Sequence, residues 1–434
     1  MARKEKVRAG EWLTLGLAGI GAGALVLGTT ALFVDFFGSP LSYTIREKPE
    51  KPLDSDSFVR YLSVVTGGTM CRAQLTRLRN GEQFYPDELD AVRKAQRSVN
   101  LEYYEFAEGR VGSEILDALT ERARAGVEVR IIVDAAGSFH TRNGFFDRLR
   151  AAGGQMRWYN PLRLKDWQRA NNRTHRKLMV IDGQMGFIGG AGIADHWIYR
   201  TKEGPAWRDT VFRVEGEAVS GLISTFSENW LECSGEILSG SGQFGSTPCP
   251  DGAPGFVVIS TPHGGGTQAR ILFQVLIQCA RHSLRITTPY FLPDRSAREA
   301  LAEAARRGVR VEILTAGPYI DHPIVRRLSR ESSRRMLEAG ASIHEYQPSM
   351  IHAKLMTVDH QWCVVGSTNF DHRSFGLNDE VNLAVLDRNL AAVIESDFEE
   401  DLRQSRPLTM AELRQSGLLS HKDELLDHVL KWES

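Results

Sequence analysis

Apolar residues recur in this chain with two different periods, and the alternation between the periods is repeated in both halves of the sequence. Short apolar runs, typical of strands, are followed by stretches in which Leu and Ala return every three or four residues, as on one face of a helix. The paired strand patterns are 98–104 with 283–290 and 126–132 with 308–314, and the paired helical patterns are 113–125 and 296–307. Strands that alternate with helices predict an α/β fold, in which helices flank a mixed sheet.

Each half continues with an apolar run that carries a His-x-Lys-x-x-x-x-Asp motif. The two copies are His175, Lys177 and Asp182 in the first half, and His352, Lys354 and Asp359 in the second. Side chains two residues apart on a strand lie on the same face, so each histidine points the same way as its lysine. Each aspartate begins a predicted tight turn into a further strand. Two copies predict halves related by a pseudo-two-fold axis, with both histidines at a shared cleft.

A histidine beside a lysine suits the chemistry of a phosphodiester. The lysine neutralises the nonbridging oxygens, and the imidazole supplies a nucleophile or a proton donor. We therefore expect both histidines and both lysines to be catalytic. Asp182 and Asp359 complete the motifs and are counted with them, although their place favours holding the turn over touching substrate. No metal and no other cofactor is expected, because the lysines supply the charge that a metal otherwise would.

The beginning of the chain predicts a membrane anchor. No charged residue interrupts the run from Trp12 to Val34, and roughly 20 apolar residues span a bilayer. A cleavable signal peptide has a shorter apolar core, so an uncleaved single-pass helix is favoured. Basic residues before the helix favour a cytoplasmic N-terminus and an active site on the outer face of the membrane.

Composition shifts suggest how the chain is divided. A stretch rich in Ser, Gly and Pro separates the halves and predicts a surface linker. The predicted segments are an anchor (1–37), a connector (38–90), a first half (91–237), a linker (238–256), a second half (257–405) and a helical tail (406–434). The five cysteines show no metal-binding spacing and are expected to be free thiols. The net charge of −1 argues against a nucleic-acid binder.

The two motifs resemble those of the phospholipase D superfamily, and four further segments resemble its bacterial cardiolipin synthase branch. These segments are 207–210, 289–293, 351–354 and 369–374, and the resemblance covers about residues 90–405. It implies a phosphohistidine intermediate, with His175 as nucleophile and His352 as acid/base. The residues alone do not order the two histidines, because the halves are nearly symmetric.

The resemblance also implies roles for four residues outside the motifs. Asn369 and Ser367 match the phosphate-binding turn, and Asp209 and Glu380 match acids that orient the histidines. Without the resemblance, an exposed surface position explains both acids equally well. The turn departs from the family pattern in the first half, where Gly192 stands in place of an asparagine. We expect Gly192→Asn to be tolerated and to raise turnover, and Asn369→Ala to be far more damaging than Gly192→Ala.

The function that the resemblance implies is a phosphatidyltransferase anchored in the bacterial plasma membrane. It would join two molecules of phosphatidylglycerol and release glycerol, without nucleic acid as a partner. A phospholipase D hydrolase, in which water is the acceptor, would use the same residues. A nuclease and a non-enzymatic scaffold are further alternatives, of which the anchor and the net charge disfavour the nuclease and the two intact motifs disfavour the scaffold.

Overall fold

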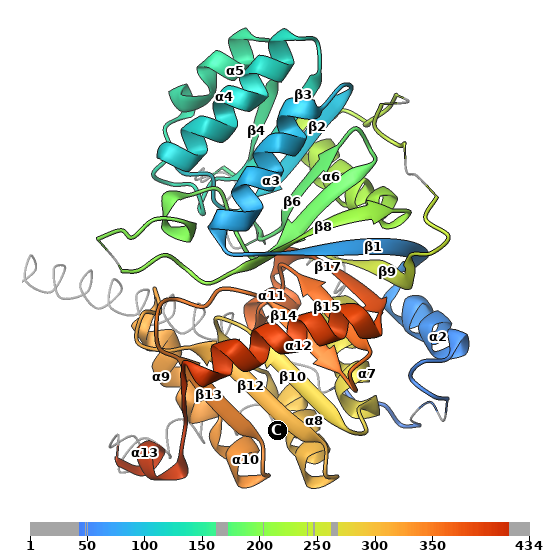
Figure 1. Ribbon diagram of the computed structural model, residues 1–434, viewed down its shortest axis with the longest axis vertical. Coiled ribbons are helices and arrows are strands. Elements are labelled where there is room, and N and C mark those ends of the chain that lie inside the picture. Colours follow the sequence, from blue (N-terminus) through green and yellow to red (C-terminus); the bar gives the residue numbers. More distant parts are fainter. Residues whose placement is uncertain are drawn as a thin grey trace, which may run out of the picture.

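The computed structural model describes residues 43–47, 49, 51–161, 172–202, 204–240, 242–245, 248–261 and 268–415. The predicted anchor at 1–37 and most of the predicted tail at 406–434 lie outside these residues. Within the described part of the chain, no helix combines the length and the apolarity that crossing a bilayer requires. The described residues form two halves, which Figure 1 shows one above the other with strand β1 running between them.

One large mixed sheet runs through both halves, and its strand order reads the same from the centre outwards in each. In the first half the order is β1 (Thr69–Arg79), β8 (Thr210–Gly216), β7 (Met185–Gly189), β6 (Lys177–Ile181), β2 (Ser98–Tyr103), β3 (Glu128–Asp134) and β4 (Gln155–Tyr159). In the second half it is β9 (Ala253–Ser260), β17 (Asn378–Leu386), β15 (Trp362–Gly366), β14 (Leu355–Val358), β10 (Ser283–Thr287), β12 (Arg310–Ala316), β13 (Ser342–Tyr346) and β18 (Ser405–Pro407). The halves join through the antiparallel pair β1–β9. The predicted α/β class and the pseudo-two-fold relation are therefore confirmed.

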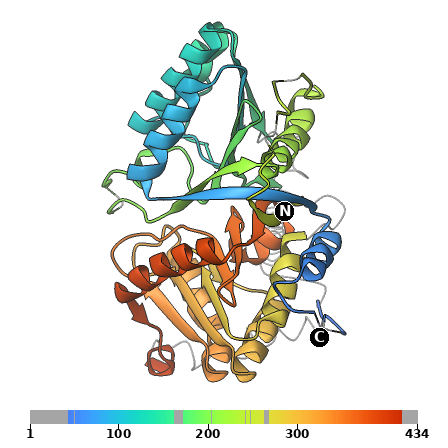
Figure 2. The ribbon, with the colours of Figure 1, turned by 45° about the vertical axis from the view of Figure 1, so that its right-hand side comes forward.

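Helices cover both faces of the sheet in each half (Figures 1 and 2). On one face lie α3 (Gly81–Lys94), α4 (Arg110–Arg124) and α5 (Asp147–Ala151) in the first half, and α7 (Gln268–Cys279) and α8 (Arg295–Arg306) with α2 (Asp56–Thr66) in the second. On the other face lie α6 (Ala218–Ser234) and α12 (Arg388–Arg403). The remaining short elements are β5 (Arg173–Thr174), β11 (Phe291–Leu292), β16 (Phe370–Asp371), α9 (Pro323–Ser332), α10 (Arg334–Glu338), α11 (His372–Gly376) and α13 (Met410–Gln415).

The strands alternate their side chains between the two faces, as the apolar patterns require. Ile131 of β3 packs into the core beneath α3 and α4, whereas its neighbour Ile132 packs into the core beneath α6. This second core is continuous across the halves, since it contains Leu222 of α6 and Ile394 of α12. Burial of these apolar faces holds the two halves in one body.

Two strands of the sheet lie in, or begin within, the predicted connector and the predicted linker. Strand β1 falls within the predicted connector at 38–90, yet it lies at the centre of the sheet. Strand β9 begins within the predicted linker at 238–256. The apolar pattern missed β1 because only Ala73 and Leu78 of its residues are buried.

The two motif aspartates begin the turns at the far end of the histidine strands. Asp182 and Asp359 have φ of 53° and 52°, a left-handed conformation that aspartate tolerates better than most residues. The Asp182 carboxylate accepts the backbone N–H groups of residues 96, 97 and 98. The Asp359 carboxylate accepts those of residues 281, 282 and 283. Each carboxylate thus ties the hairpin to the next strand, in the turn-holding position that the sequence favoured.

We predict that Asp182→Ala and Asp359→Ala lower stability but leave the chemistry intact. Each substitution strands three backbone donors, which costs on the order of 2–3 kcal/mol. The melting temperature should fall by several degrees, while turnover per folded molecule stays near that of the wild type. Asp90→Ala on the exposed side of α3 is the control, since the Asp90 carboxylate is exposed and pairs with Lys94 at the surface. Loss of turnover in a variant that remains folded at the assay temperature would contradict the structural role.

Candidate functional site

Both histidines are buried where the two halves meet, and each is paired with a carboxylate from the opposite half. His175 Nδ1 lies 2.9 Å from Glu380 Oε1 on β17 of the second half. His352 Nδ1 lies 3.1 Å from Asp209 Oδ2, just before β8 of the first half. A carboxylate on Nδ1 fixes the tautomer and leaves Nε2 to react. The structure brings together both predicted acids and both histidines, in a crossed arrangement that the sequence did not indicate.

Backbone pairing builds this crossing twice. In the first motif, β5 pairs in parallel with β17, and the His175 N–H donates to the Asp379 carbonyl at 2.9 Å. In the second, Arg208 and Ile351 form a parallel bridge, and the His352 N–H donates to the Arg208 carbonyl at 2.7 Å. Each histidine segment is therefore held against the acid-bearing segment of the other half, so the site is complete only when the halves are joined.

The two motif lysines are buried beside the histidines. Lys177 Nζ donates to the His175 carbonyl at 2.7 Å. Lys354 Nζ lies 2.8 Å from His352 Nδ1 and 3.1 Å from Nε2. Two ammonium groups at a junction of low dielectric are suited to bind the charged oxygens of a phosphoryl group.

Aromatic side chains that the sequence reasoning missed enclose the histidines. The ring centroid of Tyr104 lies 5.3 Å from that of His175. Those of Trp207 and Trp197 lie 5.2 Å and 5.7 Å from that of His352. Tyr104 directly follows β2, so its place after a strand beside the motif strand was the available signal.

Burial and crowding of like charges shift the ionisation of the cluster. Burial, together with Lys177 and Lys354, holds the pKa of His175 well below its usual range. Burial and Lys354 lower the pKa of His352 to about 3. Burial also lowers the pKa of Lys354 to about 8. Both imidazoles are therefore neutral in the resting site, and an anionic substrate would relieve the repulsion among the cations.

The two carboxylates differ in their electrostatic state. Burial raises the pKa of Glu380 to about 7, although Lys177 opposes the shift. Burial is also the largest influence on Asp209, but hydrogen bonds from His352 and the Thr210 N–H, together with the positive charge on Lys354, outweigh it and lower the pKa of this carboxyl. His352 therefore faces a carboxylate that is ionised at neutral pH. His175 faces a carboxyl that is only partly ionised there.

Two side chains of the turn after the second motif lie at the site: the Ser367 hydroxyl, which supports Glu380, and the Asn369 amide. The Ser367 hydroxyl donates to Glu380 Oε2 at 2.5 Å and accepts the Val381 N–H at 3.0 Å. Its hydrogen is therefore directed at the orienting acid, and the phosphate contact of Ser367 stays a prediction. Asn369 is buried, and its Oδ1 has no hydrogen-bond partner among the described residues. A buried polar atom left unpaired costs free energy, so the Asn369 carbonyl oxygen remains available as an acceptor for a hydrogen-bond donor of a ligand.

The structure contradicts the expectation that Gly192→Asn is tolerated. A Cβ atom at Gly192 would lie 2.9 Å from the Glu105 carbonyl oxygen and 3.0 Å from the Trp197 ring. Real Cβ atoms keep larger distances, so an asparagine there would displace the backbone or the indole. Gly192 is a position of close approach, and no room is left for a second phosphate-binding amide.

A buried polar network that the sequence did not reveal lies beneath the first motif. Glu102 accepts hydrogen bonds from Thr174 Oγ1 at 2.5 Å and Asn229 Nδ2 at 2.6 Å. Arg176, between the motif histidine and lysine, is fully buried with its Nη1 atom 3.9 Å from Glu102 Oε1. The corresponding residue of the second motif is Ala353. The network holds the residues on both sides of His175 in place.

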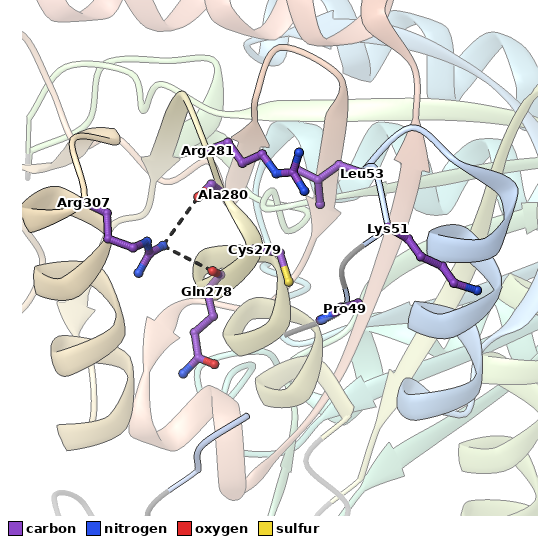
Figure 3. Close-up of a pocket in the computed structure, with 8 residues that line it drawn as sticks. All are labelled: Pro49, Lys51, Leu53, Gln278, Cys279, Ala280, Arg281 and Arg307. Atoms are coloured by element: carbon purple, nitrogen blue, oxygen red, sulfur yellow. Dashed lines mark hydrogen bonds between the residues drawn. The ribbon is translucent and has the colours of Figure 1, made fainter. Parts of the chain in front are cut away.

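A separate surface cavity of about 160 Å³ opens beside the end of α7 and is lined in part by Lys51, Arg281 and Arg307 (Figure 3). It contains neither motif histidine, so it is not the reaction centre. In the part of the chain that the structure describes, no group of three or more His, Cys, Asp or Glu side chains is placed to hold a metal ion. The five cysteines form no disulfide.

We predict that Glu380→Gln abolishes turnover and yet stabilises the fold at pH 8. A carboxyl whose pKa rises from 4.5 to about 7 on folding loses stability as the pH rises through that window. Replacing it with a neutral amide removes this loss, worth up to about 3 kcal/mol. Thermal unfolding at pH 5 and pH 8 measures the effect, which should appear only at pH 8.

Asp209→Asn is the matched control, because the pKa of Asp209 is lowered on folding. Its carboxylate stabilises the fold above the unfolded pKa, so this variant should be less stable than the wild type at pH 8. Equal destabilisation by both substitutions would contradict the assigned difference between the two acids.

Comparison with known proteins agrees with this geometry. The family model described as "Cardiolipin synthase, PLD-like domain" matches residues 89–204 and 274–402, which include both motifs. The chain is 34% identical to a probable cardiolipin synthase of Bacillus subtilis over 355 residues, which cover 81% of this chain and 71% of the relative. It is 35% identical to a cardiolipin synthase of Geobacillus thermodenitrificans over 350 residues, covering 79% and 69%.

Solved structures of low sequence identity share the fold. A phosphatidylserine synthase of Haemophilus influenzae superposes with a TM-score of 0.63 at 15% identity, covering 81% of this chain and 92% of the other. A polyphosphate kinase of Porphyromonas gingivalis superposes with a TM-score of 0.50 at 14% identity, covering 82% and 54%. With two matched domains, both motifs and relatives at this identity, the chain belongs to the phospholipase D-like family of cardiolipin synthases.

Proposed function

We propose that this protein is a cardiolipin synthase that transfers a phosphatidyl group from one phosphatidylglycerol to a hydroxyl group of a second, with release of glycerol. The observation that carries the proposal is the pair of crossed histidine–carboxylate contacts, with a lysine beside each histidine, at one buried junction. Such a junction has the groups needed to attack a phosphodiester twice at the same phosphorus. The relatives that are named cardiolipin synthases support the choice of lipid substrate.

The transfer proceeds in two displacements. Once the phosphodiester anion offsets the lysine charges, the second histidine binds a proton on Nε2. In the first displacement, Nε2 of the other histidine attacks phosphorus, the bond to the glycerol oxygen breaks, and the protonated histidine gives that oxygen its proton. In the second, the acceptor hydroxyl gives its proton to the second histidine, its oxygen bonds to phosphorus, and the phosphorus–nitrogen bond breaks. The enzyme ends as it began, with one phosphatidyl group moved.

The difference between the two acids supports His175 as nucleophile and His352 as acid/base. A nucleophile must be neutral, and His175 faces a carboxyl whose pKa burial raises to about 7. An acid/base group must gain and lose a proton, and a firmly ionised carboxylate such as Asp209 stabilises the imidazolium form. The lysines and Asn369 are placed to bind the phosphoryl oxygens during both displacements.

We further propose that residues 1–37 anchor the enzyme in the bacterial plasma membrane as a single pass, with the catalytic halves on the outer face. The uncharged run from Trp12 to Val34 and the basic residues before it support this topology. The anchor would keep the enzyme at the surface where both of its lipid substrates reside.

A phospholipase D hydrolase is the second candidate, and the enclosure of the site disfavours it. His175 and His352 are 8% and 7% exposed, and Tyr104 and Trp207 pack against them. With a lipid bound against these rings, bulk water would be displaced from the histidines, which favours a bound alcohol as acceptor.

Incubation of the full-length protein with phosphatidylglycerol in detergent-dispersed lipid tests the function. Mass analysis of the extracted lipids should show cardiolipin, with one glycerol released for each cardiolipin formed. The double variant His175→Ala/His352→Ala is the control and should form neither product. Phosphatidic acid as the main product would identify a hydrolase, and cleavage of single-stranded DNA without lipid conversion would overturn the proposal.

We predict that His352→Ala accumulates a phosphatidyl adduct on His175. A donor lipid with a p-nitrophenol leaving group avoids the need for a proton donor in the first step. The second step still needs a base, so it should be slow and the adduct should persist. Intact-mass analysis and peptide mapping locate the adduct. An adduct on His352 in the His175→Ala variant, with none in His352→Ala, would reverse the roles.

A further inference from the structure

The two histidine–acid pairs are supported in different ways. In the second half, Ser367 donates a hydrogen bond to Glu380. Gly190 occupies the corresponding position of the first half and has no hydroxyl to give Asp209. Ala191 and Gly192 follow in the first half, where the second half has Thr368 and Asn369. The first half therefore lacks all three polar side chains of the turn.

The indole of Trp197 fills this place. Its Nε1 donates to Asp209 Oδ2 at 2.9 Å, and the same oxygen lies 3.1 Å from His352 Nδ1. The Trp197 ring also contacts the His352 ring edge to face, with centroids 5.7 Å apart. The side chain is buried, with 2% of its surface exposed. One tryptophan thus touches both members of the pair.

The glycines of the turn leave the space that the Trp197 indole and the Asp209 carboxylate occupy. A Cβ atom at Gly192 would lie 3.0 Å and 3.1 Å from Cη2 and Cζ3 of the Trp197 ring. A Cβ atom at Gly190 would lie 2.5 Å from Asp209 Oδ1. The Tyr85 hydroxyl holds the turn in this position, since it lies 2.9 Å from the Gly192 carbonyl oxygen.

We propose that Trp197 is a positioning residue for the acid/base histidine, acting through Asp209, and that Gly192 is required because it makes room for the indole and Gly190 because it makes room for the Asp209 carboxylate. The indole N–H donates a hydrogen bond to Asp209, as the Ser367 hydroxyl donates one to Glu380 in the other half. This inference deepens the proposed function and rests on it for the role of His352.

The groups around Asp209 and His352 determine whether loss of the Trp197 N–H raises or lowers the pKa of His352. Asp209 and His352 face Lys354, Lys177 and His196, and the Arg208 guanidinium binds the Asp209 carbonyl. The indole donor competes with the imidazole for the Asp209 carboxylate. Removing the donor leaves a more basic carboxylate, which stabilises the protonated form of His352 and raises the pKa of the imidazole. Loss of the donor also leaves the orientation of the Asp209 carboxylate less restricted.

Trp197→Phe keeps a ring against His352 but removes the N–H. Measured on the full-length enzyme, kcat should fall roughly 10-fold while KM stays unchanged, because a hydrogen bond to a charged group is lost away from the bound lipid. The limb of the kcat–pH profile that reports His352 should move to higher pH by roughly half a unit. A role in packing alone would change neither the pH profile nor kcat per folded molecule.

Trp230→Phe is the matched control. Trp230 is fully buried on α6, and its Nε1 donates to Glu236 Oε2 at 3.3 Å, away from both histidines. This substitution removes an equivalent indole donor and should lower the melting temperature without moving the pH profile. Similar pH profiles for Trp197→Phe, Trp230→Phe and the wild type would overturn the proposal.

A double-variant cycle tests the coupling to the glycine. Phenylalanine lacks the Cη2 and Cζ3 atoms that crowd residue 192, so Gly192→Asn should damage kcat less in the Trp197→Phe background than in the wild type. Equal damage in both backgrounds would show that Gly192 serves only the backbone and would overturn that part of the inference.

Turnover of bis(p-nitrophenyl) phosphate, measured beside lipid transfer, separates the two proposals. If the wild type cleaves this diester but forms no cardiolipin, the proposed function fails, while the Trp197→Phe pH shift is still measured on the surrogate. If cardiolipin forms and Trp197→Phe leaves both pH profiles unchanged, the inference about Trp197 fails alone.

Discussion

The structure depends on the crossed contact between each histidine and the acid of the opposite half. His175 reaches Glu380 and His352 reaches Asp209 because parallel backbone pairing carries each histidine segment over to the partner half. The continuous sheet through β1 and β9 and the apolar core shared by α6 and α12 fix the relative orientation of the two halves. This orientation allows both histidine–acid contacts between the halves. Neither half has a complete site by itself, so duplication and catalysis are linked in this fold.

The same junction is electrostatically unfavourable before substrate binds. Lysines whose pKa values burial lowers lie against neutral histidines and a carboxyl whose pKa burial raises. Rigid surroundings keep these groups together, and a phosphodiester would neutralise the excess of buried positive charge. Stability is given up locally for a site already organised around the charge of its substrate.

The sequence predicted the repeated units well, because they depend on local periodicity. Strands such as β2 and β12 and helices such as α4 and α8 lie close to the predicted ranges. It missed β1, since this strand buries few apolar side chains and is recognised only through its partners β8 and β9. Likewise, the motif spacing indicated His175 and His352, but their crossed acids, the Ser367–Glu380 contact and the Trp197 indole depend on long-range packing that spacing does not encode.

Nuclear magnetic resonance of the full-length protein in detergent micelles, with ¹⁵N-labelled histidine, tests the crossed pairing most directly. The Nδ1–H protons of His175 and His352 should give separate downfield signals, because each is held by a buried carboxylate. The account predicts that Glu380→Gln perturbs the His175 signal and spares that of His352, and that Asp209→Asn does the reverse. If instead each substitution perturbs the histidine of its own half, the histidines and acids are not crossed, and the central claim is wrong.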